Sequence, residues 1–156
     1  QFLTDVLWGD LDYLFLDLPP GTGDVALDVA RMLPRSNMLI VTTPQVVAAG
    51  VASRAAHMAQ KSNQRILGVV ENMSTFVCPD CGKATSIFGE GGGKNLADEL
   101  GTELLAQIPL TLPLREGSDQ GRPIVFAEGT ENDPARQAIE ALADRVVQLT
   151  PVPTKA

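Results

Sequence analysis

The chain contains the stretch Asp12-Tyr-Leu-Phe-Leu-Asp17-Leu-Pro-Pro-Gly21-Thr-Gly23-Asp24, in which a short apolar run leads into a turn rich in proline and glycine. The apolar run is typical of a buried strand, and Asp17 would stand at its carboxyl end. In nucleotide-hydrolysing α/β proteins, a carboxylate at that position holds magnesium, directly or through water. A glycine after it lets a backbone N–H approach the terminal phosphate. A plain strand-turn-helix junction fits the bare pattern equally well.

The composition of the chain limits the number of domains and the classes of partner that it can have. The chain has 156 residues, of which 44% are hydrophobic, enough for one core. We expect residues 1–150 to be part of a single domain and residues 151–156 to be a flexible tail. The formal charge of −7 and the aromatic content of 4% argue against nucleic acid, which needs clustered Lys and Arg and stacking side chains. No membrane span or signal peptide is visible, and with so few cysteines this predicts a cytoplasmic protein without a membrane partner.

Hydrophobic patterning predicts strands that alternate with helices. Besides 12–17, strands are expected at 37–42, 65–71 and 103–108, and helices at 24–33, 46–61, 94–100 and 135–149. Asp24 and Asp133 are expected as helix caps. With right-handed crossovers this order predicts an α/β fold, a doubly wound and mostly parallel sheet with helices on both faces.

The remaining segments are less regular. Residues 1–7 are expected to be the end of a helix, and Arg115, Glu116 and Asp119 to lie in a polar loop. Residues 72–93 are expected to form an irregular loop, long enough to suggest a function. Within it, Gly89–Lys94 is interpreted as a flexible turn that leads into the next helix.

A series of landmarks follows along the chain. They are Asp17-Leu-Pro-Pro-Gly-Thr-Gly-Asp24, Val70-Glu-Asn-Met-Ser74, Cys78-Pro-Asp-Cys81-Gly82, Phe88-Gly-Glu-Gly-Gly-Gly93, Ile108-Pro-Leu110, and Leu114-Arg-Glu-Gly-Ser-Asp119 with Gly121-Arg-Pro123. In this order they resemble the Mrp/ApbC family of iron–sulfur carrier ATPases, within the wider MinD/ParA group of P-loop proteins. The landmarks span most of the chain, so together they are far more specific than any one of them.

One element of a P-loop enzyme is missing from the sequence. Its phosphates are held by Gly-x-x-x-x-Gly-Lys-[Ser/Thr], and this string does not occur. Gly93-Lys94 does not qualify, because Phe88 stands five residues before Gly93 and Asn95 follows Lys94. In the family, the phosphate loop lies upstream of anything resembling residues 12–24. We therefore expect this chain to be the C-terminal portion of a longer protein, incomplete at its N-terminus. We assign it no catalytic residue, and by itself it should not hydrolyse ATP.

The resemblance implies a nucleotide site on this chain. Asp17 would take the Mg²⁺ role through a coordinated water, and Gly21 would offer its N–H to the γ-phosphate of ATP. Pro20 would shape that loop and Thr22 would add a hydroxyl contact. Asn72 would read the adenine edge, since an amide offers both a donor and an acceptor. From spacing alone, Asp17 also fits a turn cap and Asn72 a turn former.

The motif Cys78-Pro-Asp-Cys81 is a more specific signal than the candidate nucleotide residues. A Cys-x-x-Cys pair in a loop places two thiolates on one metal, and sulfur ligands favour zinc or an iron–sulfur cluster. Both prefer four ligands, which two such loops would supply at the axis of a symmetric dimer. Zinc bound by the same cysteines, a thioredoxin-like redox pair and two free thiols stay open as alternatives, although a redox pair should open a helix.

The resemblance implies a labile [4Fe–4S] cluster that bridges a homodimer through Cys78 and Cys81 and is transferred to apo iron–sulfur proteins. ATP hydrolysis would modulate the transfer. The competing hypothesis is a MinD/ParA-like regulatory ATPase in which the same cysteines hold structural zinc.

Overall fold

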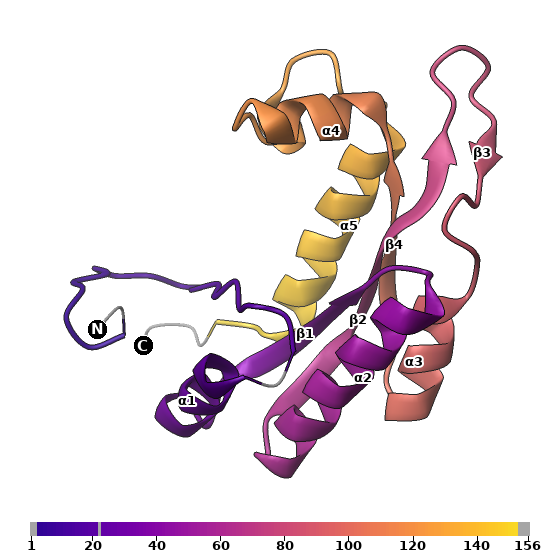
Figure 1. Ribbon diagram of the computed structural model, residues 1–156. Coiled ribbons are helices and arrows are strands. Elements are labelled where there is room, and N and C mark those ends of the chain that lie inside the picture. The colour runs from indigo at the N-terminus through magenta and orange to yellow at the C-terminus, as the bar shows by residue number, and fades with distance from the viewer. Residues whose placement is uncertain (1–2, 22, 153–156) are drawn as a thin grey trace.

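The computed structural model describes residues 3–21 and 23–152. Its elements are α1 (Asp24–Met32), β1 (Asn37–Thr42), α2 (Val46–Lys61), β2 (Arg65–Val77), β3 (Ala84–Thr85), α3 (Gly92–Leu100), β4 (Leu104–Leu110), α4 (Leu112–Asp119), the 3-10 helix η1 (Ile124–Phe126) and α5 (Pro134–Leu149). Figure 1 shows their arrangement in space.

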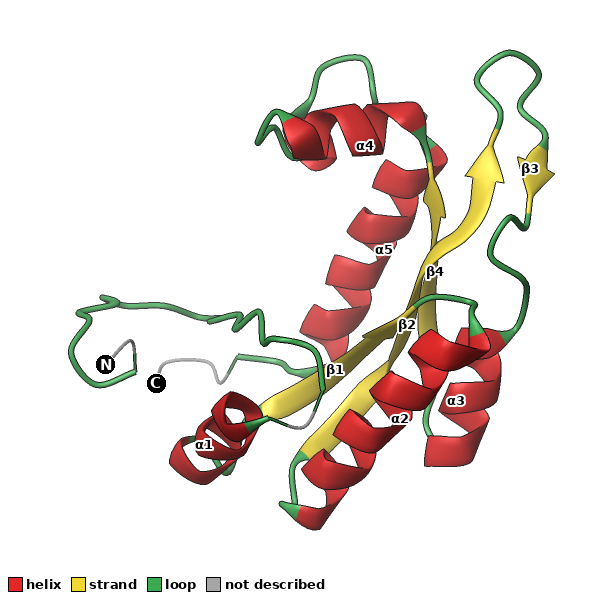
Figure 2. Cartoon of the chain, viewed as in Figure 1, coloured by secondary structure: helices red, strands yellow, loops and turns green. Residues whose placement is uncertain are grey.

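The sheet is built around β2. This strand pairs in parallel with β1 on one side and with β4 on the other, while the short β3 pairs antiparallel with its far end. The helices α2 and α3 lie on one side of the sheet and α5 on the other (Figure 2). The predicted α/β class, a mostly parallel sheet with helices on both faces, is therefore confirmed.

The core lies between the sheet and the helices α2 and α3. Ile40 of β1, Val69 of β2 and Leu96 of α3 are buried there. They pack against Ala52 and Ala56, which lie four residues apart on α2, and against Ala97 of α3. Alanine at positions four apart leaves no bulk on that face of α2, so the helix approaches the strands closely.

The strand expected at 12–17 does not form. Residues 11–19 have no regular secondary structure, and Leu14 and Phe15 are exposed. The N-terminal chain extends to the side of the sheet before it reaches α1 (Figure 1), and Tyr13 donates its hydroxyl hydrogen to the Thr150 carbonyl oxygen at 2.7 Å. An apolar run becomes a strand only where a neighbour pairs its N–H and C=O groups, and this segment pairs with no strand of the described chain.

Other boundaries also differ from the expectation. Of the helix end expected at 1–7, residues 3–7 form a turn and irregular chain, and residues 1–2 lie outside the described part. The N-cap of α1 is Gly23 and not Asp24, which is the first helical residue. β4 continues through Pro109 to Leu110. The polar loop expected around Arg115 is the helix α4, whose N-cap Thr111 accepts a hydrogen bond from the Leu114 N–H.

Candidate functional site

The cysteines lie at the tip of a hairpin that grows out of the sheet. β2 runs on past Asn72, where the expected irregular loop should begin, and Met73 bends the strand with a φ of 55°. Phe76 and Val77 then pair with Thr85 and Ala84 of β3. Most of the expected loop at 72–93 is thus two legs of a hairpin, which Figure 1 shows projecting beyond the body of the protein.

The turn at the hairpin tip favours a thiolate at Cys78. The Gly82 N–H donates to the Cys78 carbonyl oxygen at 2.9 Å, and the Cys78 N–H donates to the Lys83 carbonyl oxygen at 3.1 Å. The backbone N–H groups of Cys81 and then Asp80, followed by the Cys81 thiol, donate to the Cys78 sulfur and lower the pKa of the Cys78 thiol. Donors aimed at sulfur stabilise its charged form, the form that binds metal.

Both cysteines are reduced and accessible. Cys81 is exposed, Cys78 is half-buried, and neither forms a disulfide. Within residues 3–21 and 23–152, no cluster brings three or more His, Cys, Asp or Glu side chains together. A four-ligand centre at this tip therefore needs donors that the described part of one chain does not place there.

The predicted nucleotide residues lie around a different feature, an open groove of about 1380 Å³. It runs between residues 12–21, α1, β1 and α2, and its lining includes Asp17, Pro20, Gly21 and Asn72. Gly21 has a φ of 94°, a left-handed conformation that favours glycine. Thr22 lies outside the described residues. The groove thus gathers the other predicted nucleotide residues, whereas Cys78 and Cys81 are not part of its lining.

Asn72 is engaged locally. Its side-chain oxygen accepts a hydrogen bond from the N–H of the next residue, Met73, at 2.9 Å. The contact joins two neighbouring residues inside β2, so Asn72 does not close a strand as a turn former, the second of the two interpretations that spacing allowed. The amide group still lines the groove.

A buried carboxylate beside the hairpin escaped the sequence analysis. Glu71 is 1% exposed, and its Oε2 accepts a hydrogen bond from the Gly93 N–H at 2.6 Å. Its Oε1 accepts a second from Gln107 Nε2 at 2.7 Å. The expected flexible turn at Gly89–Lys94 is accordingly wrong in its second half, because Gly92 and Gly93 are buried residues of α3. The signal in the sequence that could have identified Glu71 is an acidic residue within an apolar strand.

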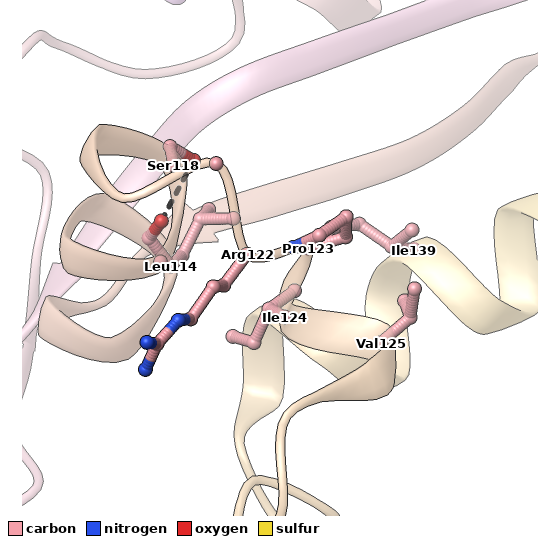
Figure 3. Close-up of a pocket in the computed structure, with 9 residues that line it drawn as sticks. Leu114, Ser118, Arg122, Pro123, Ile124, Val125 and Ile139 are labelled. Carbon is pink, nitrogen blue, oxygen red and sulfur yellow. Dashed lines mark hydrogen bonds between the residues drawn. The ribbon is translucent and has the colours of Figure 1, made fainter.

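A small apolar pocket of about 400 Å³ lies away from these residues. Leu114 of α4, Ile124 of η1 and Ile139 of α5 line it (Figure 3). The Ser118 hydroxyl beside it donates to the Leu114 carbonyl oxygen at 2.8 Å. None of the predicted site residues lines this pocket.

Comparison with solved structures defines the class of protein. A nucleotide-binding protein from Archaeoglobus fulgidus, solved in complex with ADP, is similar with a TM-score of 0.68 and 45% identity, over 78% of this chain and 50% of that one. The MinD cell division protein of Aquifex aeolicus is similar with a TM-score of 0.54 and 26% identity, over 74% and 45% of the two chains. The fold is that of MinD/ParA-type P-loop NTPases.

Sequence comparison narrows the class to a family. A ParA family model described as NUBPL iron-transfer P-loop NTPase matches residues 1–147. An iron-sulfur cluster carrier protein of Mycobacterium leprae is 50% identical over 92% of this chain and 38% of its own length. One of Methanocaldococcus jannaschii is 44% identical over 94% and 51%. The chain belongs to this family of iron–sulfur carrier P-loop NTPases, and it spans about half the length, or less, of these relatives.

Proposed function

We propose that this chain is the cluster-carrying part of an iron–sulfur carrier ATPase, and that Cys78 and Cys81 bind a labile [4Fe–4S] cluster shared by two copies of the chain. The observation that carries this proposal is the hydrogen-bonded turn at 78–83, which holds two accessible thiols at the tip of the hairpin. Two copies would provide four thiolates, the number that such a cluster needs.

The cluster is the cargo and apo iron–sulfur proteins are its recipients. Ligands at the tip of a hairpin, outside the packed core, suit a cargo that must leave again. The thiolate form of Cys78, favoured by the tip hydrogen bonds, holds iron, and protonation of that sulfur weakens its hold. Two cysteines three positions apart make a poor structural disulfide framework, which suits a reducing compartment, and we propose that the protein is cytoplasmic. None of the helices in the described part is long and apolar enough to cross a bilayer.

The nucleotide part of the proposal uses the groove residues. Asp17 would hold a water of Mg²⁺, Gly21 would donate its N–H to phosphate, and Asn72 would contact the base once its amide leaves the Met73 N–H. Pro20 and Thr22 would shape the phosphate-side loop. The groove lining supports this grouping for all of these residues except Thr22, which is not described. No phosphate-loop motif occurs in the chain, so we propose that it does not hydrolyse ATP by itself and that the activity belongs to a longer polypeptide.

Anaerobic reconstitution with iron and sulfide tests the cluster proposal. About four irons and four sulfides should be retained per dimer of the wild type, with the dimer established by solution mass. The Cys78→Ser/Cys81→Ser variant should retain none, while Thr85→Ala, which changes an exposed side chain on the same hairpin outside the tip, should match the wild type. A well-folded wild type that binds no metal would contradict the proposal.

A regulatory ATPase with structural zinc is the second candidate, because the MinD protein of Aquifex aeolicus has the same fold. One zinc per dimer without sulfide, resistant to chelators, would favour it.

A further inference from the structure

The helix α3 receives its cap from another element of the fold. Its N-cap residue is Gly91, which has no side chain, and no local side chain accepts a hydrogen bond from the first turn. The Glu71 carboxylate, on β2, accepts the Gly93 N–H instead. Gln107 of β4 donates to the other oxygen of the same carboxylate and fixes its orientation.

Two hydrogen-bond donors and the start of a helix face the Glu71 carboxylate. The ion pairs of the described residues do not include Glu71. The Gly93 N–H belongs to the first turn of α3, which is the positive end of the helix dipole and favours an acceptor at this position. A buried carboxylate with these partners is a strong acceptor, and the loss of either partner leaves it unsatisfied.

Glycine is required on the helix side of this contact. A Cβ on Gly93 would lie 2.7 Å from the Glu71 Cβ, and one on Gly92 would lie 2.8 Å from the Pro44 carbonyl carbon. The start of α3 therefore packs closely against both the middle of β2, at Glu71, and the turn after β1, at Pro44. The Gly93–Glu71 hydrogen bond and this close packing both fix the start of α3.

This contact closes the base of the cysteine hairpin. The outgoing leg starts at Asn72, the residue after Glu71, and the returning leg ends where α3 begins, at Gly91–Gly93. We propose that Glu71 is a positioning residue that holds both legs together and thereby orders the tip that carries Cys78 and Cys81. The functional part of this inference rests on the proposed role of these cysteines.

Between the tip and its base, the returning leg of the hairpin has few other contacts. β3 is two residues long, and its pairing covers only Phe76↔Thr85 and Val77↔Ala84. The returning leg adds a hydrogen bond from the Ser86 hydroxyl to the Glu90 carboxylate at 2.7 Å. The outgoing leg also pairs with β4, at Asn72↔Ile108 and Phe76↔Leu110. The returning leg has no such second neighbour strand in the described chain, so the anchor at its base determines how well this leg is ordered.

Two substitutions at Glu71 distinguish the effect of its hydrogen bonds from the effect of its side-chain volume. Glu71→Ala removes both acceptors. Glu71→Gln keeps an oxygen for the Gly93 N–H and offers an N–H to Gln107, whose amide can turn to present its oxygen. Val69→Ala is the matched control, because Val69 is fully buried on the same face of the same strand and packs in the core with Leu96 and Ala97 of α3.

The first readout is backbone hydrogen exchange of the metal-free chain, followed by mass spectrometry. In Glu71→Ala we expect exchange in the segment 84–93 to be about tenfold faster, relative to α5, than in the wild type. Glu71→Gln should stay within about threefold of the wild type and Val69→Ala should not single out this segment. Equal exchange in Glu71→Ala and Val69→Ala would overturn the positioning role. If Glu71→Ala fails to fold, Gln107→Ala, which removes one partner only, replaces it with the same criterion.

The second readout is Co²⁺ titration of the reduced chain, followed by thiolate–metal absorption. Glu71→Ala should bind Co²⁺ about tenfold more weakly, and Glu71→Gln should largely restore the affinity. Unchanged Co²⁺ affinity in Glu71→Ala would overturn the link to the cysteines. If the wild type binds no Co²⁺ while exchange responds as expected, the proposed cluster function fails and the role of Glu71 in holding the hairpin stands.

Discussion

Replacing Gly92 by alanine should destabilise the protein, although helix propensity alone predicts the opposite. Gly92 is the first residue of α3, and alanine is favoured over glycine inside a helix by about 1 kcal/mol. A Cβ at this position would lie 2.8 Å from the Pro44 carbonyl carbon and closer still to its oxygen. These are backbone atoms, so the strain is relieved only by moving α3 or the turn after β1.

The expected magnitude follows from the balance of the two effects. Overpacking against fixed atoms typically costs about 1–3 kcal/mol, and contact with backbone places Gly92→Ala at the upper end of that range. After the gain in helix propensity, we expect the free energy of unfolding to fall by about 1–2 kcal/mol.

Gly50→Ala provides the matched control. Gly50 lies within α2, and a Cβ there would meet no atom within 4 Å. This substitution should raise the free energy of unfolding by up to about 1 kcal/mol. Urea denaturation followed by circular dichroism measures both variants, with unchanged slopes expected because neither alters the surface exposed on unfolding. A Gly92→Ala protein as stable as the wild type would refute the close packing of α3 against Pro44.

The other predictions concern the hairpin tip and the start of α5. Alkylation of Cys78 should show a lower pH midpoint in the folded chain than in urea, because the Cys81 and Asp80 N–H groups favour its thiolate; equal midpoints would contradict that geometry. Because the pKa of Cys78 is lower in the folded chain than in the unfolded chain, its ionisation stabilises the folded state. This contribution is fully present above the unfolded pKa and is lost as the pH falls through the folded pKa. Asp133→Ala should lower the free energy of unfolding by about 1–2 kcal/mol in thermal melts, because Asp133 caps α5 and accepts the Thr111 hydroxyl; Asp133→Asn should recover most of it, and no loss in the alanine variant would argue against the cap.

Several elements could be predicted from local sequence alone. β1 and α2 have the predicted bounds, 37–42 and 46–61, and α5 has the predicted cap Asp133. Their patterns repeat within a few residues, so each segment carries its own signal. The helix α4 was missed although Thr111 and Pro113 form an N-terminal signal, because its polar composition obscures the apolar face.

The site was predicted unevenly for the same reason. The thiol pair follows from its spacing, since both ligands lie within one turn of chain. Glu71 did not follow, because its partners Gly93 and Gln107 stand 22 and 36 residues further along. Only the fold brings them to one point.

The sequence by itself determined the α/β class, most helices and strands, the family landmarks and the cysteine pair, all of which depend on order and short-range spacing. The tertiary structure decided which apolar runs become strands. Residues 12–17 have the composition of a buried strand, but they pair with no strand of the described chain and stay irregular. It also decided that the returning leg of the hairpin ends on a buried carboxylate. Both results depend on hydrogen-bond partners far away in sequence, which local patterns do not encode.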